Sequence, residues 1–439
     1  MMRLSTNLTG AVLFLAALAT PVAAEPLSAQ EAQIVESVKA SLEEQIAFLG
    51  QAVDINSGTM NADGVRAVGD LFAGAFDGLG FETEWETLPA ELNRAGHFHA
   101  KREGERGNRV LLIGHIDTVF DGASEGTKFR REGDTAFGPG ASDMKGGDVV
   151  VLYALKALHE AGALDGAKIE VLFTGDEEAP GQPVSISRKS LIEAAGHTDV
   201  ALNFEGGEEG AVVTSRRGSS GWTLTTTGLR RHSSGIFSKE VGAGAVFEAS
   251  RILNAFYDKL HKEKYLTFNP GVIVGGTDVT YDEERTAGEA FGKTNVVAQK
   301  VVVDGGLRFI SEEQKESARE RMRKIVAQHL PHTDATIEFT DSYPAMAPTE
   351  GNKALLAVFS GVSEDLGYGA VTGNDPAQRG AADISFVAPL VPASMDGLGV
   401  RGEGAHTLEE SVDLATLEEV TARAAILIYR LTCEDAPKF

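Results

Sequence analysis

Apolar residues recur along the chain with two alternating periods, one typical of helices and the other of buried strands. Helical spacing predicts helices at 28–49, 61–76, 149–158, 184–195 and 414–431. The first begins at a capping box formed by Ser28 and Glu31, and Asn61 caps the second. Strands are predicted at 82–88, 97–102, 110–113, 169–173 and 200–204. This alternation predicts an α/β fold, with a mixed, mostly parallel sheet covered by helices on both faces.

The pattern changes between residues 216 and 345. Two amphipathic helices, at 241–260 and 311–330, are accompanied there by strand-like stretches at 218–227, 272–274, 295–303 and 336–339. Trp222 and Leu224 share one face of the first strand, as in a sheet with one exposed side. The α/β pattern then resumes. Residues 216–345 are therefore predicted to form an α+β sandwich domain, inserted into a larger domain made of 25–215 and 346–439.

Residues 1–24 have the pattern of a secretory signal. Arg3 is followed by an apolar run at 11–19 and by small residues, 22–24, that are typical of a cleavage site. The run is too short to span a bilayer, although an N-terminal membrane anchor is the alternative interpretation. We expect cleavage after Ala24 and a periplasmic or secreted protein. The single cysteine, Cys433, excludes an internal disulfide.

The charge of the chain excludes several classes of partner. Its 439 residues include 40 basic and 64 acidic ones, which gives a net charge of −24. Such an excess of acid disfavours nucleic acids and anionic membrane surfaces as partners. The length and a hydrophobic content of 42% are sufficient for two packed domains. We therefore expect neither nucleic acid nor, after removal of the signal, a membrane among the partners.

Candidate chemistry is concentrated where predicted strands end. The Gly-rich turn GPGASDMKGG, residues 138–147, carries Asp143, which a simple helix cap would also explain. Upstream, a strand ends in GHIDT (114–118), and downstream another ends in TGDEE (174–178). Open α/β sheets place their sites at such strand ends, so these side chains are predicted to meet. We interpret Asp143 as a carboxylate that bridges two metal ions.

Two divalent cations held close together need carboxylate oxygens and imidazole nitrogens. Five such residues lie at predicted strand ends or in Gly-containing turns, namely His115, Asp143, Glu178, Glu205 and His406. Asp117 follows His115 by two residues on an extended backbone, so it points the same way and can hold the imidazole. Adjacent glutamates are usually surface residues. In this setting, after a buried strand and a glycine, one of Glu177 and Glu178 can bind metal while its neighbour takes a proton from a metal-bound water.

The ordered motifs GHIDT, GASDMKGG, TGDEE, NFEGG and GAHTLEE resemble those of the co-catalytic dizinc metallopeptidase and aminoacylase family. That family includes bacterial glutamate carboxypeptidase, aminoacylase and succinyl-diaminopimelate desuccinylase. The resemblance implies two zinc ions per chain, with other divalent metals as alternatives. One would be held by His115, Asp143 and Glu205, and the other by Asp143, Glu178 and His406. It also implies that Glu177 is the general base, that Asp117 lies behind His115, and that the peptide after Asp143 is cis.

The same resemblance identifies the inserted domain as a lid and dimerisation domain. GLRRHSSG (228–235) matches the segment whose histidine, here His232, reaches the partner subunit's site and stabilises the oxyanion. TNVV (294–297) matches the segment whose asparagine, here Asn295, lines the substrate pocket. A homodimer formed through this domain is therefore expected. Without the resemblance, a histidine beside two arginines would more often be a surface residue.

The chain departs from the family pattern where the substrate is expected. The usual Asp-x-Arg is replaced by GLR (306–308), with Asp304 displaced, and residues 281–293 look inserted. Tyr343 stands where glutamate carboxypeptidases have an arginine, and RGAAD (379–383) replaces a Gly-Gly-Thr/Ser-Asp loop. We interpret Arg308 as the cation that holds a substrate carboxylate. Arg379 and Arg401 are alternative candidates for this role. Arg308 could instead have only a structural role, in which it pairs with Asp304 or another acid of the inserted domain.

These features predict a zinc-dependent hydrolase that cleaves amide bonds of small peptides or N-acyl amino acids, like a glutamate-carboxypeptidase-type exopeptidase. A water between two metals would lose a proton to Glu177 and attack the carbonyl, and Glu177 would then protonate the leaving amine. The alternative is a catalytically silent exported protein of the same fold that binds zinc or peptides and has no need of Glu177. A serine hydrolase is disfavoured because the chain lacks a convincing Gly-x-Ser-x-Gly elbow.

Overall fold

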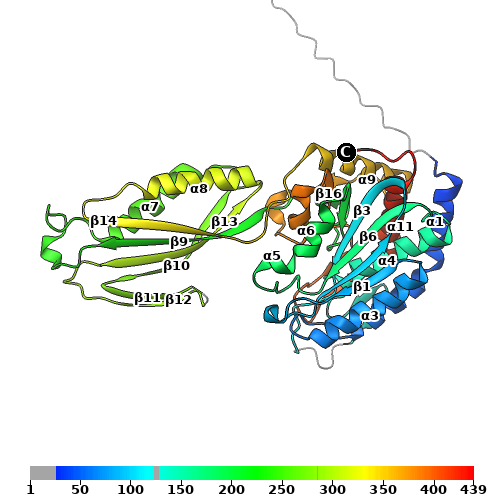
Figure 1. The fold of residues 1–439 in the computed structure, drawn as a ribbon, viewed down its shortest axis with the longest axis horizontal. Coiled ribbons are helices and arrows are strands. Elements are labelled where there is room, and N and C mark those ends of the chain that lie inside the picture. The colour runs from blue at the N-terminus through cyan, green and yellow to red at the C-terminus, as the bar shows by residue number, and fades with distance from the viewer. Residues whose placement is uncertain (1–25, 123–127, 284) are drawn as a thin grey trace, which may run out of the picture.

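The computed structural model describes residues 26–122, 128–283 and 285–439, so the predicted signal at 1–24 lies outside the described residues. The chain forms two units (Figure 1). The main unit is built on a six-stranded sheet, and the inserted unit, from β9 to β14, on a four-stranded sheet. None of the described helices is long and apolar enough to cross a membrane.

The six-stranded sheet of the main unit is mixed. Its strands, in spatial order, are β1 (Glu82–Glu86), β2 (His97–Arg102), β6 (Ala167–Thr174), β3 (Arg106–His115), β7 (Val200–Asn203) and β16 (Ala393–Met395). The four strands from β6 to β16 are parallel neighbours, whereas β1–β2 and β2–β6 pair antiparallel. The predicted mixed, mostly parallel sheet is therefore confirmed.

Helices cover both faces of this sheet. Successive residues of a strand point to opposite faces, and those of the central strands are buried in two different cores. On β3, Val110 and Leu112 belong to the larger core, and Leu111 and Ile113 to a second core. The larger core includes α1 (Ala29–Ala40), α2 (Leu42–Asp54), α3 (Ala62–Gly78), α4 (Lys145–Glu160), α9 (Glu350–Asp365) and α11 (Leu417–Thr432). The second includes α5 (Val184–Ser187), α6 (Lys189–Ala195) and α10 (Ile384–Val387).

Two helices predicted as continuous are each divided in the structure. The capping box of Ser28 and Glu31 is present, but the first helix is interrupted at Ser41, whose hydroxyl donates to the carbonyl oxygen of Val38. The second division falls at Arg188, which separates α5 from α6 and whose side chain is fully buried in ion pairs. In both places a side-chain interaction takes precedence over the periodicity of the apolar residues.

A small second sheet of the main unit joins two distant parts of the sequence. It has the order β17 (Gly402–Glu403), β18 (Ser411–Asp413), β5 (Thr135–Phe137) and β4 (Arg130–Glu132). Because β18 pairs with β5, the loop that follows β5 lies beside the loop that precedes β18. Asp143 is in the first loop and His406 is in the second. One further short pair in the described part of the main unit joins β8 (Ala211–Val212) and β15 (Thr372–Gly373), which are parallel.

The sheet of the inserted unit is antiparallel, with the order β10 (Thr267–Gly276), β13 (Lys300–Phe309), β9 (Gly218–Gly228) and β14 (Thr333–Asp341). Helices α7 (Ala245–Leu260) and α8 (Glu312–Val326) cover one face, where Trp222 and Leu224 are buried. The strand predicted at 295–303 begins only at Lys300. The inserted-looking residues contribute to a hairpin that the sequence did not predict, made of β11 (Asp278–Asp282) and β12 (Ala287–Phe291).

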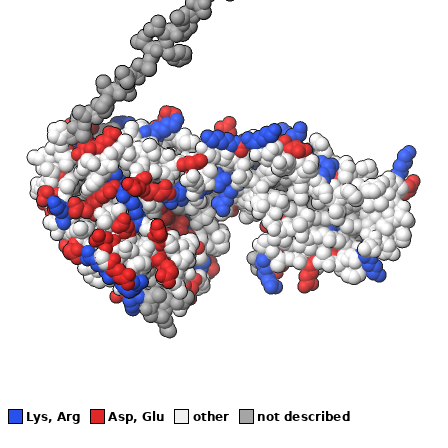
Figure 2. Space-filling view, turned by 180° about the vertical axis from the view of Figure 1, so that it is seen from behind, with Lys and Arg blue, Asp and Glu red and all other residues white. Residues whose placement is uncertain are grey.

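The two units differ in surface charge. Figure 2 shows acidic side chains gathered over the main unit, whereas the inserted unit carries few charged side chains on the same face. The surface is hollowed between the two units in this view. Most of the acidic excess visible here is therefore solvated surface of the main unit.

Candidate metal centre

Three neighbouring parallel strands bring the predicted chemistry to one edge of the main sheet. His115 is the last residue of β3, Glu177 and Glu178 closely follow the end of β6, and Glu205 follows β7. Because β6, β3 and β7 are adjacent and parallel, their carboxyl ends meet at this edge. Asp143 approaches from the loop before α4, and the structure therefore gathers residues that are up to 90 positions apart in sequence.

Asp143 lies between two histidines. Its Oδ1 atom is 3.2 Å from His115 Nε2, and its Oδ2 atom is 3.1 Å from His406 Nε2. Glu205 Oε1 is 3.9 Å from His115 Nε2, whereas Glu178 Oε2 is 3.2 Å from His406 Nε2. The two oxygens of Asp143 thus face two separate groups of donor atoms. The peptide after Asp143 is cis, as the resemblance implied.

His406 reaches this position from an unusual backbone conformation. Its φ angle is +65°, in the left-handed region that residues other than glycine rarely adopt. Such conformations concentrate at functional sites, where the surrounding structure maintains them. The side chain of His406 is 57% exposed, so this residue forms the open side of the cluster.

Glu177 also lies close to the donor atoms of the cluster. One atom each from His115, Asp143 and Glu178 lie within 4.8 Å of one another, and the same holds for His115, Glu177 and Glu205. Proximity alone therefore does not distinguish Glu177 from the predicted metal ligands. What distinguishes the two glutamates is His406. Glu178 contacts this histidine, which also contacts Oδ2 of Asp143, whereas no contact between Glu177 and His406 is found among the described residues.

Asp117 is the buried anchor of the cluster. Its carbonyl oxygen lies 3.1 Å from His115 Nδ1, and its Oδ1 atom lies 3.4 Å from the same nitrogen. Its carboxylate also accepts hydrogen bonds from the backbone N–H groups of Glu177 and Glu178, and from the hydroxyl of Thr59. One side chain thus orients the His115 ring and fixes the loop that carries both glutamates.

The pKa values of the cluster reflect negative charge enclosed at short range. Burial raises the pKa of Glu178 to about 7 and that of Glu205 to about 8, and it raises the pKa of Glu177 well above its usual range. The hydrogen bond to Asp143 raises the pKa of His406 to about 9. Burial alone would lower the pKa of His115, but its contacts with Asp117 and Asp143 raise it well above the usual value.

This donor set fits a pair of divalent cations. It offers imidazole nitrogens and carboxylate oxygens, which suit zinc and similar metals. The raised pKa values of Glu177, Glu178 and Glu205 also indicate cations. Buried carboxylates are costly to ionise without positive charge nearby, and bound metal ions would supply that charge. Asp143, whose pKa is lowered by the two histidines although burial alone would raise it, is placed to be shared between two cations.

Comparison with known proteins agrees with this geometry. Residues 111–430 match the model of peptidase family M20/M25/M40. The chain belongs to this family.

Its similarity to M20/M25/M40 members extends over most of the sequence. The chain is 30% identical to carboxypeptidase G2 of a Pseudomonas species over 394 residues, which cover 88% of this chain and 89% of that one. It is 24% identical to succinyl-diaminopimelate desuccinylase of Hydrogenovibrio crunogenus, with 89% of this chain and 98% of that one covered. Among solved structures, aminopeptidase PepT of Bacillus cereus shares the fold at a TM-score of 0.70 and 18% identity, covering 88% of this chain and 98% of that one.

Members of this family are metal-dependent hydrolases of peptide or amide bonds, so the chain is a metallo-hydrolase of M20/M25/M40 type. The fold that was expected from the alternation of helices and strands, with a unit inserted into an α/β unit, is confirmed by the structure and by its neighbours. The resemblance stated from the sequence is confirmed as well.

The residues predicted to contact substrate are not all near the metal centre. His232 and Asn295 are exposed and adjacent, since the Ser233 N–H donates to the Asn295 carbonyl oxygen. His232 follows the last residue of β9 by four positions, and β9 extends from the junction with the main unit along the inserted unit (Figure 1). Arg308 lies instead on β13 opposite Ser219 of β9, near the junction with the main unit.

Sequence reasoning missed a buried carboxylate that shapes the M20 metal loop. Glu410, 1% exposed, accepts hydrogen bonds from the N–H groups of Gly140, Ser142 and Asp143 at 2.8–2.9 Å, and from the Ser142 hydroxyl at 3.1 Å. It immediately precedes β18, which pairs with β5. The available signal was its place in GAHTLEE, just before a strand, but no role was assigned to this second glutamate. Glu410 therefore holds the turn that presents Asp143.

A second buried network lies beneath Glu177. The guanidinium of Arg188 pairs with Asp176 at 2.5 Å and with Asp383 at 2.6 Å, and the Thr174 hydroxyl donates to Asp383. Asp176 directly precedes Glu177, and Asp383 ends the RGAAD loop that departs from the family pattern. Although RGAAD differs from the usual family loop, it keeps Asp383, which together with Arg188 anchors the loop that carries Glu177.

The Glu410→Gln substitution should weaken metal binding. Only one acceptor oxygen would remain, and the amide NH2 would face at least one backbone N–H of the turn that then has no acceptor, so the position of Asp143 would be less fixed. We expect the affinity for zinc to fall by roughly 10- to 100-fold, the usual effect of removing a group that orients a metal ligand. Isothermal titration of the metal-free protein measures it. The matched control is Glu409→Gln, at the exposed neighbouring position, and equal affinities for the two variants would contradict the role of Glu410.

Proposed function

We propose that the chain is an exported zinc-dependent exopeptidase that releases the C-terminal residue of small peptides or N-acyl amino acids. The observation that carries this proposal is Asp143, whose two oxygens face His115 and His406 while Glu177 lies among the same donor atoms. A silent binding protein would need the donors but not Glu177. Export and the cleavage of a signal after Ala24 remain part of the proposal.

In this proposal His115, Asp143 and Glu205 hold one zinc ion, and Asp143, Glu178 and His406 hold the other. The bound metals would supply Lewis acidity toward a water molecule and toward the carbonyl oxygen of the substrate. Asp117 keeps His115 oriented through Nδ1, so that Nε2 is directed at Asp143. Glu410 keeps the backbone of Asp143 in place.

Glu177 is the proposed general base. Burial raises the pKa of its carboxyl well above the usual range, as is typical of groups that take and return a proton near neutral pH. Its backbone N–H donates a hydrogen bond to Oδ1 of Asp117 at 3.0 Å, which fixes the position of the backbone that carries the Glu177 side chain. Glu177 would accept a proton from the attacking water and deliver it to the leaving amine.

The Glu177→Gln protein should retain both metals and lose most of its activity. The proposed ligands are unchanged, whereas an amide cannot accept the proton. We expect kcat to fall by roughly 100-fold or more, the typical contribution of general acid–base catalysis. Metal content and turnover of a dipeptide are measured on the same sample. Turnover close to that of the wild type would remove Glu177 from the mechanism, and absence of any turnover in the wild type would favour the silent binding protein.

The geometry of the inserted unit supports a role for His232 in a partner subunit. Strand β9 starts two residues after Arg216, whose guanidinium pairs with Asp396 in the main unit, and it continues for 11 residues. That length is roughly 33 Å, and the four residues from its end to His232 can return at most about 14 Å. His232 therefore cannot reach the metal centre of its own chain in this conformation.

An exposed apolar surface beside His232 supports the homodimer. Phe237 and Phe247 are 66% and 49% exposed, and their ring centroids are 5.2 Å apart. Val246, which precedes Phe247 on α7, is 47% exposed as well. Contiguous exposed apolar side chains of this kind mark surfaces that another protein covers. We propose that a second copy of the chain covers this surface and supplies His232 to the neighbouring site.

Mixing two inactive variants tests this arrangement. Glu177→Gln and His232→Ala chains, exchanged to equilibrium, should recover about one quarter of wild-type activity, because half of the dimers are mixed and each contains one intact site. The control mixture pairs Glu177→Gln with Asp117→Asn, which leaves no intact site in any dimer. No recovery in the first mixture, with subunit exchange verified by mass spectrometry, would place His232 outside the partner's site.

Arg308 is the proposed partner of the substrate carboxylate. In the part of the chain that the structure describes it forms no ion pair, and Asp304 instead accepts a hydrogen bond from the Thr223 hydroxyl. The alternatives are engaged, since Arg379 pairs with Glu208 at 2.6 Å and Arg401 with Glu419 at 2.5 Å. Arg308 is thus the candidate whose guanidinium is available to a carboxylate.

The Arg308→Met variant should bind carboxylate-bearing substrates less tightly. We expect KM to rise by about tenfold for each 1.4 kcal/mol of lost binding free energy, with little effect on the same compounds after amidation of the carboxylate. Steady-state kinetics on matched free and amidated peptides measures both values. Arg401→Met serves as the control, and equal cleavage of both forms by the wild type would contradict a requirement for the carboxylate.

A further inference from the structure

The β11–β12 hairpin is a packed second layer on the inserted unit. Val302 lies on the opposite face of β13 from Val301 and Val303, which belong to the core beneath the helices, yet it is only 3% exposed. The hairpin packs over β10 and β13 on this open face. The base of the hairpin is tied to the sheet by the Thr277 N–H, which donates to the Phe291 carbonyl oxygen at 2.8 Å. The hairpin is therefore a fixed wall rather than a loose insertion.

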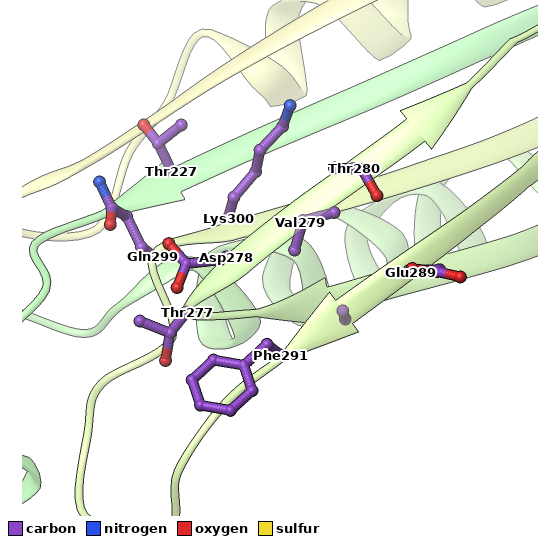
Figure 3. A pocket seen from close by; sticks show the side chains of 10 residues that line it. Thr227, Thr277, Asp278, Val279, Thr280, Glu289, Phe291, Gln299 and Lys300 are labelled. Carbon is purple, nitrogen blue, oxygen red and sulfur yellow. The ribbon is translucent and has the colours of Figure 1, made fainter.

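A pocket of about 510 Å³ lies between this wall and the end of the sheet (Figure 3). Its volume is in the range typical of small-molecule sites. The sheet contributes the ends of β9 and β13, with Lys300 as the only cation in the lining, and the hairpin contributes two acids and a phenyl ring.

The lining is suited to a peptide main chain. It combines hydroxyl, amide, ammonium and carboxylate groups, which can donate to and accept from an extended backbone. Charges of both signs make it a poor site for a polyanion, and its polar groups lie beside an apolar part that includes Val279 and Ala290, as a peptide with side chains requires. The ring of Phe291, 56% exposed, offers the one large apolar contact of the lining.

The pocket is adjacent to the residues proposed to enter the partner's site. Asp278, in its wall, pairs with Arg230 at 3.2 Å, and Arg230 precedes His232 by two residues. Thr277 lines both this pocket and a second hollow of about 300 Å³, whose lining includes Thr294 and Val296, the two sequence neighbours of Asn295. A ligand held by His232 and Asn295 would thus have this pocket next to it.

We propose that the hairpin and the ends of β9 and β13 form a subsite for the acyl-side extension of a peptide substrate. The inference rests on the proposed function, in which the substrate's other end is a free carboxylate. The enzyme then prefers peptides of three or more residues to dipeptides, because only longer peptides extend into the pocket. The specificity of one active site is set by the hairpin of the partner subunit.

A deletion tests the subsite. Residues 278–291 are replaced by Asn-Gly, since Asp278 and Phe291 are directly opposed and this two-residue turn joins antiparallel strands. Values of kcat/KM are measured for Ala-Glu, Ala-Ala-Glu, Ala-Ala-Ala-Glu and decanoyl-Glu. In the wild type the tripeptide should be the better substrate, and the deletion should lower the tripeptide-to-dipeptide ratio about tenfold, equivalent to about 1.4 kcal/mol. Turnover of Ala-Glu should be unchanged, which also shows that the variant is folded.

Point variants and an alkyl substrate separate the remaining explanations. Lys300→Ala should lower the tripeptide-to-dipeptide ratio, whereas Lys324→Ala, on α8 across the sheet, should not. An equal ratio in wild type and deletion would overturn the subsite. A loss on decanoyl-Glu as large as that on the tripeptide would overturn its peptide character. A wild type that cleaves none of the four compounds would overturn the proposed function itself, whereas cleavage with an unchanged ratio overturns the subsite alone.

Discussion

Negative charge enclosed at short range is the constraint on which the metal centre depends. Asp143, Glu177, Glu178 and Glu205 converge within a few ångströms of two histidines, and burial raises the pKa of three of the four carboxyls. Such a cluster is costly unless cations balance it. Backbone N–H groups and rigid strand ends hold the loops that carry these acids, and so keep the carboxylates together despite their repulsion. The charge balance itself is left to metal ions.

The supporting residues are as informative as the donors. Asp117 and Glu410 are almost fully buried carboxylates that accept hydrogen bonds from the backbone of the loops carrying Glu177, Glu178 and Asp143. Neither loop could hold its turn with a side chain that lacks two acceptor oxygens. The positions of the donor atoms thus depend on backbone N–H groups that are anchored from behind. This arrangement is typical of sites in which the second layer of residues sets the geometry.

Much of the fold was readable from the sequence because strand ends and glycine turns leave clear local patterns. The helix caps at Ser28 and Asn61, the central strands and the convergence of His115 with Asp143 and Glu205 followed from such patterns. Interruptions by single side chains were not readable, as at Ser41 and Arg188, since their partners are distant or compete with helical bonding. The hairpin and Glu410 were missed for a related reason. Their contacts join elements far apart in sequence, and a local pattern carries no record of them.

The length of β9 has a consequence for how the enzyme works in dilute solution. If the active site takes His232 from a second chain, as proposed, it exists only in the associated state, so the number of working sites follows the law of mass action. Rate per chain would then rise with total protein concentration until the dimer is saturated, and would fall steeply on dilution below its dissociation constant. If the protein is exported into an open volume, as proposed, that dependence makes the strength of the subunit contact a determinant of catalytic output.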